Sequence, residues 1–127
     1  MKIIKTKLHG MFDYSLAFAL VSPWLINFHQ RSLDTEILAL TGLILSLVNL
    51  FTDYELGLIR IIPMKAHLIL DAVFGLFLIG LPFILPMPHY NFYWPVMMGG
   101  GVLLVVLLSS SKAYDVSRND LNITTRP

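Results

Sequence analysis

Four long apolar segments, nearly free of charged side chains, divide this chain along most of its length. A helix needs about 20 mostly apolar residues to cross a bilayer, with a range of roughly 17–25. Because the bilayer core offers the backbone no water, such segments must be helical. We therefore expect four transmembrane helices, over residues 8–28, 37–51, 66–85 and 92–110.

The balance of apolar and charged residues supports a membrane protein. Of the 127 residues, 56% are hydrophobic and only 13% are charged. A soluble domain of this size buries only about 65% of its unfolded surface, so it could not hide so many apolar side chains. The sequence predicts one all-α membrane domain over 1–127, and the partner that it predicts for this domain is the lipid bilayer.

Charge and cysteine content exclude several classes of function. The net charge of +1 gives no sign of nucleic-acid binding. The chain has no cysteine, which rules out disulfides, thiolate metal sites, iron–sulfur clusters and thiol redox chemistry. The sequence also carries no phosphate-binding loop, no nucleophile–base constellation and no HExxH motif. An enzymatic role is therefore not indicated.

The start of the chain resembles a signal peptide, because Lys2, Lys5 and Lys7 precede an apolar run. However, Asp13 interrupts that run, and no small-residue cleavage site follows Pro23. We expect this segment to be retained as the first transmembrane helix.

The basic residues predict the orientation. With four spans, both termini and the central loop lie on one side of the membrane, and all the Lys and Arg residues except Arg31 fall on that side. An excess of Lys and Arg marks the cytoplasmic side. We expect a multi-pass protein of the cytoplasmic (inner) membrane with both termini in the cytoplasm. Interfacial aromatic residues are expected at the outer side (Trp24, Tyr90, Tyr93, Trp94) and at the inner side (Tyr14, Tyr54, Tyr114).

The two halves of the chain match each other in order. Lys7-x-His9-x-x-x-Asp13 recurs 58 positions later as Lys65-x-His67-x-x-x-Asp71. Further matches follow at offsets of 59 and 60: Pro23-Trp24 with Pro82-Phe83, His29 with His89, and Tyr54-Glu55 with Tyr114-Asp115. This series predicts a duplicated helical hairpin, with repeat 1 at about 5–57, repeat 2 at about 63–115 and a polar tail at 116–127. Because each repeat has two spans, both have the same orientation, related by an axis along the membrane normal.

These motifs resemble the SPW-repeat family of small bacterial and archaeal integral membrane proteins. The name-giving motif is Ser22-Pro23-Trp24, and the second copy departs from it with Leu81-Pro82-Phe83. The stretches His9-Gly10-x-x-Asp13-Tyr14, Thr52-Asp53-Tyr54-Glu55-Leu56-Gly57 and His67-x-x-x-Asp71 are also similar to that family. The resemblance covers roughly residues 5–115. It implies a fold and a membrane location but no activity and no catalytic residues.

Two His/Asp pairs are the candidate site. His9 and Asp13, like His67 and Asp71, are four positions apart and so share a helix face at about 6 Å. Ionisable residues in membrane spans are costly, at about 2.5–3.5 kcal/mol at mid-membrane, and often mark sites. If both helix faces point toward the interior of the protein, the two pairs would meet between the first and third helices, near the cytoplasmic face. They could bind zinc, manganese or ferrous iron, relay protons, or hold a haem between two imidazoles. Alternatively, they only stabilise the starts of their helices, where the dipole favours a carboxylate.

A supporting polar layer is expected on the same side of the membrane. Its members are Lys7, Lys65, Asp53, Glu55 and Arg60. Asp53 either pairs with one of the lysines or is a solvated loop charge.

Three hypotheses for function follow. The first is a non-enzymatic structural or accessory membrane module without a cofactor, which associates with itself or with a larger membrane complex. The second is a transport-type module that binds a divalent metal or protons at His9, Asp13, His67 and Asp71. The third is a haem- or quinone-linked redox protein.

Overall fold

The structure is a computed structural model that describes residues 4–30, 32–87 and 89–109, with the backbone alone for 89–91. It is all-helical, and no strand occurs in the described part of the chain. The all-α prediction with four helices is therefore confirmed. The predicted pair Tyr114-Asp115 and the tail 116–127 lie outside the described residues. The helices are α1 (Thr6–Ile26), α2 (Leu33–Leu50), α3 (Met64–Ile84) and α4 (His89–Leu108).

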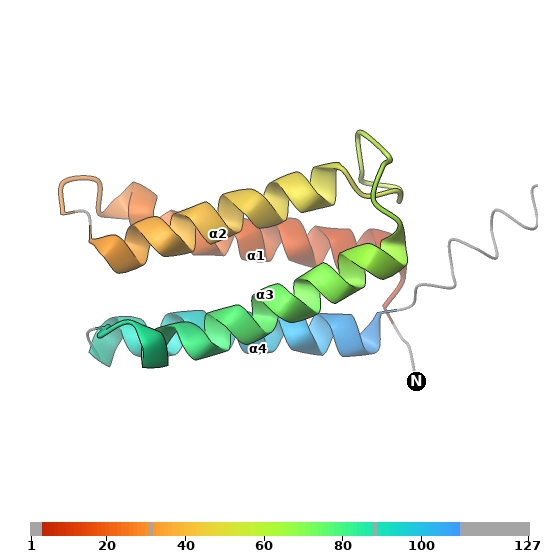
Figure 1. The fold of residues 1–127 in the computed structure, drawn as a ribbon. Coiled ribbons are helices and arrows are strands. Elements are labelled where there is room, and N and C mark those ends of the chain that lie inside the picture. The colour runs from red at the N-terminus through yellow and green to blue at the C-terminus, as the bar shows by residue number, and fades with distance from the viewer. Residues whose placement is uncertain (1–3, 31, 88, 110–127) are drawn as a thin grey trace, which may run out of the picture.

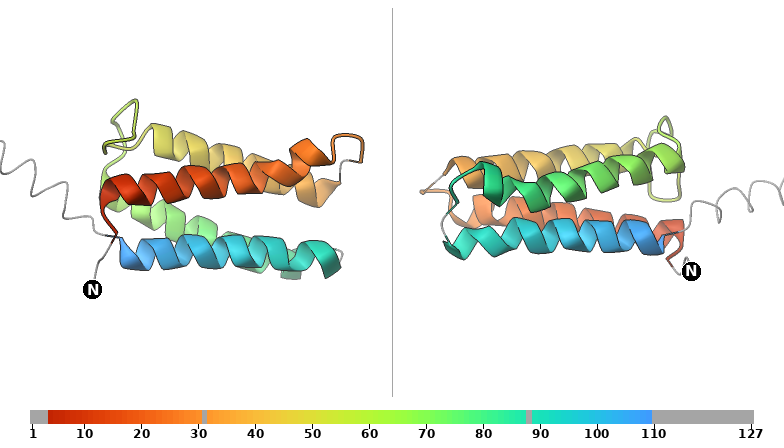
Figure 2. Two further views of the ribbon diagram at one scale, coloured as in Figure 1. Left: turned by 180° about the vertical axis from the view of Figure 1, so that it is seen from behind. Right: turned by 60° about the horizontal axis from the view of Figure 1, so that its bottom comes forward.

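The four helices form a bundle of two antiparallel hairpins, α1 with α2 and α3 with α4 (Figure 1). The start of α1, the connection 51–63 and the end of α4 lie together at one end of the bundle, which we call the loop end. Seen from behind, α1 and α4 run side by side (Figure 2). Helices α1 and α3 therefore run in the same direction, and both begin at the loop end.

The helix boundaries differ from the predicted ones by one to four residues. The largest difference is at α2, which begins at Leu33 instead of residue 37. The Ser32 backbone N–H donates to the Thr35 hydroxyl at 3.2 Å, which satisfies one of the donors that a helix start leaves open. Asp34 and Glu36 lie in the first turn, where the helix dipole favours anions. The prediction placed the start of this helix at the first residue of the apolar run and therefore left out its polar first turn.

Small residues let the helices of each hairpin pack closely. A Cβ atom on Gly42 of α2 would lie 2.6 Å from the carbonyl oxygen of Ala17 in α1. In the second hairpin, a Cβ on Gly99 of α4 would lie 2.5 Å from the carbonyl oxygen of Gly75 in α3. Such contacts between backbones are typical of helices that associate in membranes.

Helices α2 and α3 are long and apolar enough to cross a membrane. The buried apolar core of the bundle is small. Its main cluster of buried residues is Ala17, Leu20, Leu38, Leu45, Leu78 and Leu81.

Candidate functional site

The four predicted site residues meet at the loop end, two turns into α1 and α3. His9 and Asp13 come from α1, and His67 and Asp71 come from α3. All four are buried, with exposed fractions of 0%, 5%, 1% and 1%. One ligand atom from each lies within 4.8 Å of the others. The helix faces that carry them therefore both turn toward the bundle interior.

Ring nitrogens and carboxylate oxygens alternate around a closed ring, which we call the His/Asp ring. Nε2 of His9 lies 2.9 Å from Oδ2 of Asp13 and 3.0 Å from Oδ2 of Asp71. Nε2 of His67 lies 3.0 Å from Oδ2 of Asp13 and 3.1 Å from Oδ2 of Asp71. The contacts within each helix follow from the spacing of four. The contacts between α1 and α3 join the two hairpins, since each imidazole contacts the carboxylate that belongs to the other hairpin.

Two hydroxyl groups, which the sequence analysis did not assign to the site, hold the outer nitrogens of the imidazoles. Thr52 Oγ1 lies 2.9 Å from His67 Nδ1, and Ser109 Oγ lies 2.5 Å from His9 Nδ1. Each hydroxyl also donates to the main-chain carbonyl four residues earlier, at 2.6 Å for Thr52 and 2.5 Å for Ser109. Both are fully buried. Each hairpin thus supplies a hydroxyl to the histidine of the other.

Two short parallel main-chain bridges fix the hydroxyl residues in place. Ile4, just before α1, pairs with Ser109, and Thr52 pairs with Ile62, just before α3. Ile4 N–H donates to the carbonyl of Leu108 at 2.9 Å, and Ile62 N–H donates to that of Phe51 at 2.9 Å. The end of each hairpin's second helix is therefore tied to the start of a site-bearing helix.

Tyr54 covers the His/Asp ring on one side. The sequence predicted Tyr54 at the inner membrane interface, and within the bundle its side chain is fully buried. Its ring stacks on His67, with 6.1 Å between centroids and 27° between planes, and its hydroxyl donates to Asn49 Oδ1 at 2.8 Å. Gly10 makes room for it, because a Cβ there would lie 2.7 Å from the phenol carbon Cζ. Burial raises the pKa of the Tyr54 phenol.

The predicted polar layer is only partly connected to the site. The Glu55 carboxylate accepts from the Thr6 hydroxyl at 2.7 and 2.9 Å, which links the loop to the first residue of α1. The other members lie outside the His/Asp ring and are at least partly exposed: Lys7, Asp53, Arg60 and Lys65.

A haem does not fit between His9 and His67. With two axial imidazoles, the porphyrin plane would lie between the two Nε2 atoms. Here the Oδ2 atoms of Asp13 and Asp71, each within 3.1 Å of both Nε2 atoms, take that space. The arrangement instead suits a single small cation or a set of shared protons.

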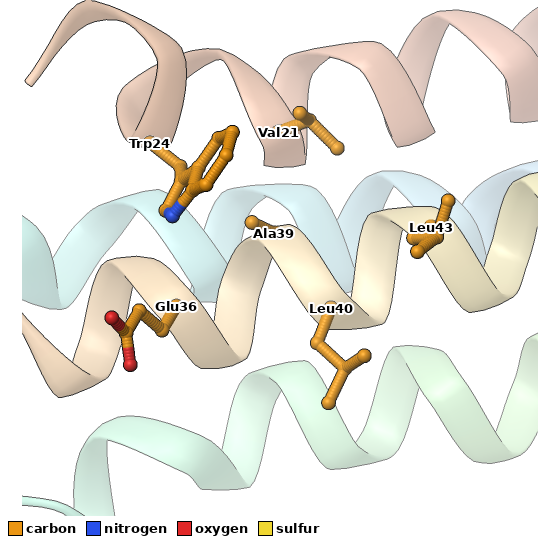
Figure 3. Close-up of a pocket in the computed structure, with 6 residues that line it drawn as sticks. All are labelled: Val21, Trp24, Glu36, Ala39, Leu40 and Leu43. Atoms are coloured by element: carbon orange, nitrogen blue, oxygen red, sulfur yellow. The ribbon is translucent and has the colours of Figure 1, made fainter. Parts of the chain in front are cut away.

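A groove of about 460 Å³ opens between α1 and α2, away from the loop end (Figure 3). Its lining is apolar apart from the Glu36 carboxylate and the indole nitrogen of Trp24. It brings together no cluster of polar or titratable groups and is not a candidate site. The residues that line it are Val21, Trp24, Glu36, Ala39, Leu40 and Leu43.

Comparison with known proteins assigns neither a family nor a function to this chain. No protein-family model, no curated protein and no solved structure matches this chain. The function is therefore inferred from the arrangement of the chain's own side chains.

Proposed function

We propose that this protein is a multi-pass membrane protein that binds one divalent transition-metal ion between its two helical hairpins. The observation that carries the proposal is the size of the His/Asp ring, whose sides measure 2.9–3.1 Å. The centre of a flat ring with 3 Å sides is about 2.1 Å from each corner, and puckering shortens this distance. Zinc is bound by imidazole nitrogen at about 2.0–2.1 Å and by carboxylate oxygen at about 2.0–2.2 Å.

The donor set and its charge suit such an ion. Two imidazole nitrogens and two carboxylate oxygens are donors that zinc, manganese and ferrous iron accept. Calcium requires six to eight oxygen ligands, so the ring does not match it. Two buried carboxylates balance the charge of one divalent cation, which a site removed from water requires. Asp13 and Asp71 would supply that balance.

Apolar side chains on the outside of the bundle support four membrane spans. α2 and α3 are long and apolar enough to cross a membrane, and large apolar side chains are exposed on every helix. Large exposed apolar surfaces are rare on water-soluble monomers and mark contact with a membrane or another protein. With the predicted orientation, the His/Asp ring would lie near the cytoplasmic face of the inner membrane. Examples, with exposed fractions of 57–75%, are Phe18, Leu40, Leu76, Phe83 and Leu107.

Equivalent contacts in the two hairpins support a duplicated unit. The Ala17–Gly42 contact of the first hairpin corresponds to the Gly75–Gly99 contact of the second, at offsets of 58 and 57. The hydroxyl–histidine contacts and the main-chain bridges correspond at the same offsets. A duplicated hairpin with a shared orientation is also what the resemblance to the SPW-repeat family implies.

A second candidate function is a structural joint in an accessory or self-associating membrane module. The contacts of His9 with Asp71 and of His67 with Asp13 favour it, because two protonated imidazoles would form the same contacts without a metal. On this alternative, Asp13→Asn and Asp71→Asn lower stability, and the protein holds no specific ion.

Metal analysis of the full chain, purified in detergent and saturated with zinc, separates the two candidates. We expect one zinc ion per chain in the wild type and none in His9→Ala or His67→Ala. His29→Ala is the matched control, because His29 is exposed and lies outside the ring. A wild type that holds no more zinc than His9→Ala contradicts metal binding and favours the structural joint.

A further inference from the structure

The hydroxyl of Thr52 determines which nitrogen of His67 carries a proton. A hydroxyl has one proton to donate and two lone pairs to accept with. Thr52 Oγ1 donates its proton to the carbonyl of Val48 at 2.6 Å. In its contact with His67 Nδ1 at 2.9 Å, the oxygen must therefore accept, and Nδ1 carries the hydrogen.

Ser109 imposes the same arrangement on His9. Its hydroxyl donates to the carbonyl of Val105 at 2.5 Å, so its oxygen accepts from His9 Nδ1 at 2.5 Å. A neutral imidazole has only one N–H. With Nδ1 protonated, Nε2 of each neutral histidine presents a lone pair. Both lone pairs then face the oxygens of Asp13 and Asp71.

Four electron-pair donors that face one another across 2.9–3.1 Å repel unless a metal ion or protons lie between them. We infer that Thr52 and Ser109 are positioning residues, which hold both imidazoles as Nδ1–H tautomers so that the site accepts a transition-metal ion through two Nε2 atoms. This inference rests on the proposed function. Metal-bound histidines commonly donate their other N–H to a protein acceptor, which fixes the tautomer and the ring orientation.

The same arrangement sets the class of ion. Imidazole nitrogen suits zinc, copper, iron and nickel, whereas magnesium prefers oxygen ligands in an octahedron. The hydroxyls also make the site depend on both hairpins, because each histidine is oriented by a residue of the other hairpin. We expect zinc to bind and magnesium in excess not to displace it.

The test compares variants that lack one hydroxyl with variants that keep it. Thr52→Val and Ser109→Ala remove the acceptor, whereas Thr52→Ser and Ser109→Thr retain it. Thr41→Val is the matched control, because Thr41 is also buried and donates to the carbonyl four residues earlier, at 2.8 Å. Zinc affinity is measured on the full chain in detergent by competition with a chromophoric chelator, and Co²⁺ absorption reports the ligand geometry.

We expect Thr52→Val and Ser109→Ala each to weaken zinc binding by about 10–100-fold and to change the Co²⁺ spectrum. Thr52→Ser and Ser109→Thr should restore most of the affinity, and Thr41→Val should bind as the wild type does. Circular dichroism checks that each variant remains helical. If Thr52→Val and Ser109→Ala bind zinc like the wild type with an unchanged Co²⁺ spectrum, the inference is wrong while the metal site stands. If the wild type binds no zinc, both this inference and the proposed metal site are wrong.

Discussion

Nε2 of His9 lies 3.0 Å from Oδ2 of Asp71, a residue 62 positions further along the chain in the other hairpin. The reciprocal contact, from His67 Nε2 to Asp13 Oδ2, has the same length. Together with the contacts of His9 with Ser109 and of His67 with Thr52, these two contacts connect the hairpins at the loop end. An ion bound within the His/Asp ring would therefore hold the two hairpins together.

Zinc should stabilise the whole fold. A ligand present at 100 times its Kd, and bound only by the native state, raises the free energy of unfolding by about 2.7 kcal/mol. We expect this increase for the wild type on addition of zinc, and its loss on addition of a chelator. Unfolding in mixed micelles, followed by circular dichroism, measures it. His9→Ala should show no response, and a similar response in that variant would place the stabilising ion elsewhere.

Gly10 is predicted to tolerate no larger residue. The Cβ of Gly10→Ala would overlap the Tyr54 ring, which cannot withdraw because it stacks on His67. Overpacking of this kind costs about 1–3 kcal/mol. Gly100→Ala is the matched control, because nothing lies within 4 Å of a Cβ there. It should be neutral or stabilise its helix by up to about 1 kcal/mol. Equal stabilities of the two variants would show that Tyr54 is not packed on Gly10.

Tyr54 should make stability fall at alkaline pH. Its pKa is raised by burial in the folded protein, whereas in the unfolded chain tyrosine ionises near pH 10. Above that pH the unfolded state binds fewer protons than the folded one, so the free energy of unfolding decreases by up to about 1.4 kcal/mol per pH unit. Unfolding measured from pH 9 to 11 should show this slope in the wild type. A slope that is equally steep in Tyr54→Phe would mean that Tyr54 ionises freely in the fold.

The site residues could be predicted from the sequence because their signal is local and repeated. His9/Asp13 and His67/Asp71 share a spacing of four, and that spacing alone turns each pair to one helix face. Thr52 and Ser109 carry no such signal, since they lie 15 and 100 positions from the histidines they contact. Their equivalent places at the ends of the two halves, 57 positions apart, are the only pattern that points to them.

The burial of Tyr54 inside the bundle could not be predicted for a related reason. A tyrosine between charged residues at the end of an apolar segment is typical of a membrane interface. Its burial depends on the space that Gly10 leaves on α1 and on Asn49, whose Oδ1 accepts a hydrogen bond from the Tyr54 hydroxyl. Contacts between distant segments of this kind have no counterpart in local sequence pattern.

The orientation can be tested with single cysteines, because the chain has none of its own. Leu58→Cys places a thiol in the exposed connection 51–63, and Gln30→Cys places one in the exposed connection between α1 and α2. In intact cells, a membrane-impermeant maleimide should label Gln30→Cys but not Leu58→Cys, and permeabilisation should expose both. Labelling of Leu58→Cys alone in intact cells would show that the orientation is the opposite of the predicted one.

X-ray absorption at the zinc edge of the zinc-loaded wild-type protein tests the metal site most directly. A single ion in the His/Asp ring predicts four nitrogen or oxygen neighbours at about 2.0–2.2 Å, two of which show the multiple scattering of imidazole. His9→Ala should lose one imidazole from that pattern or bind no zinc. A shell of six oxygens without imidazole, or a spectrum that His9→Ala leaves unchanged, would contradict binding between the two hairpins.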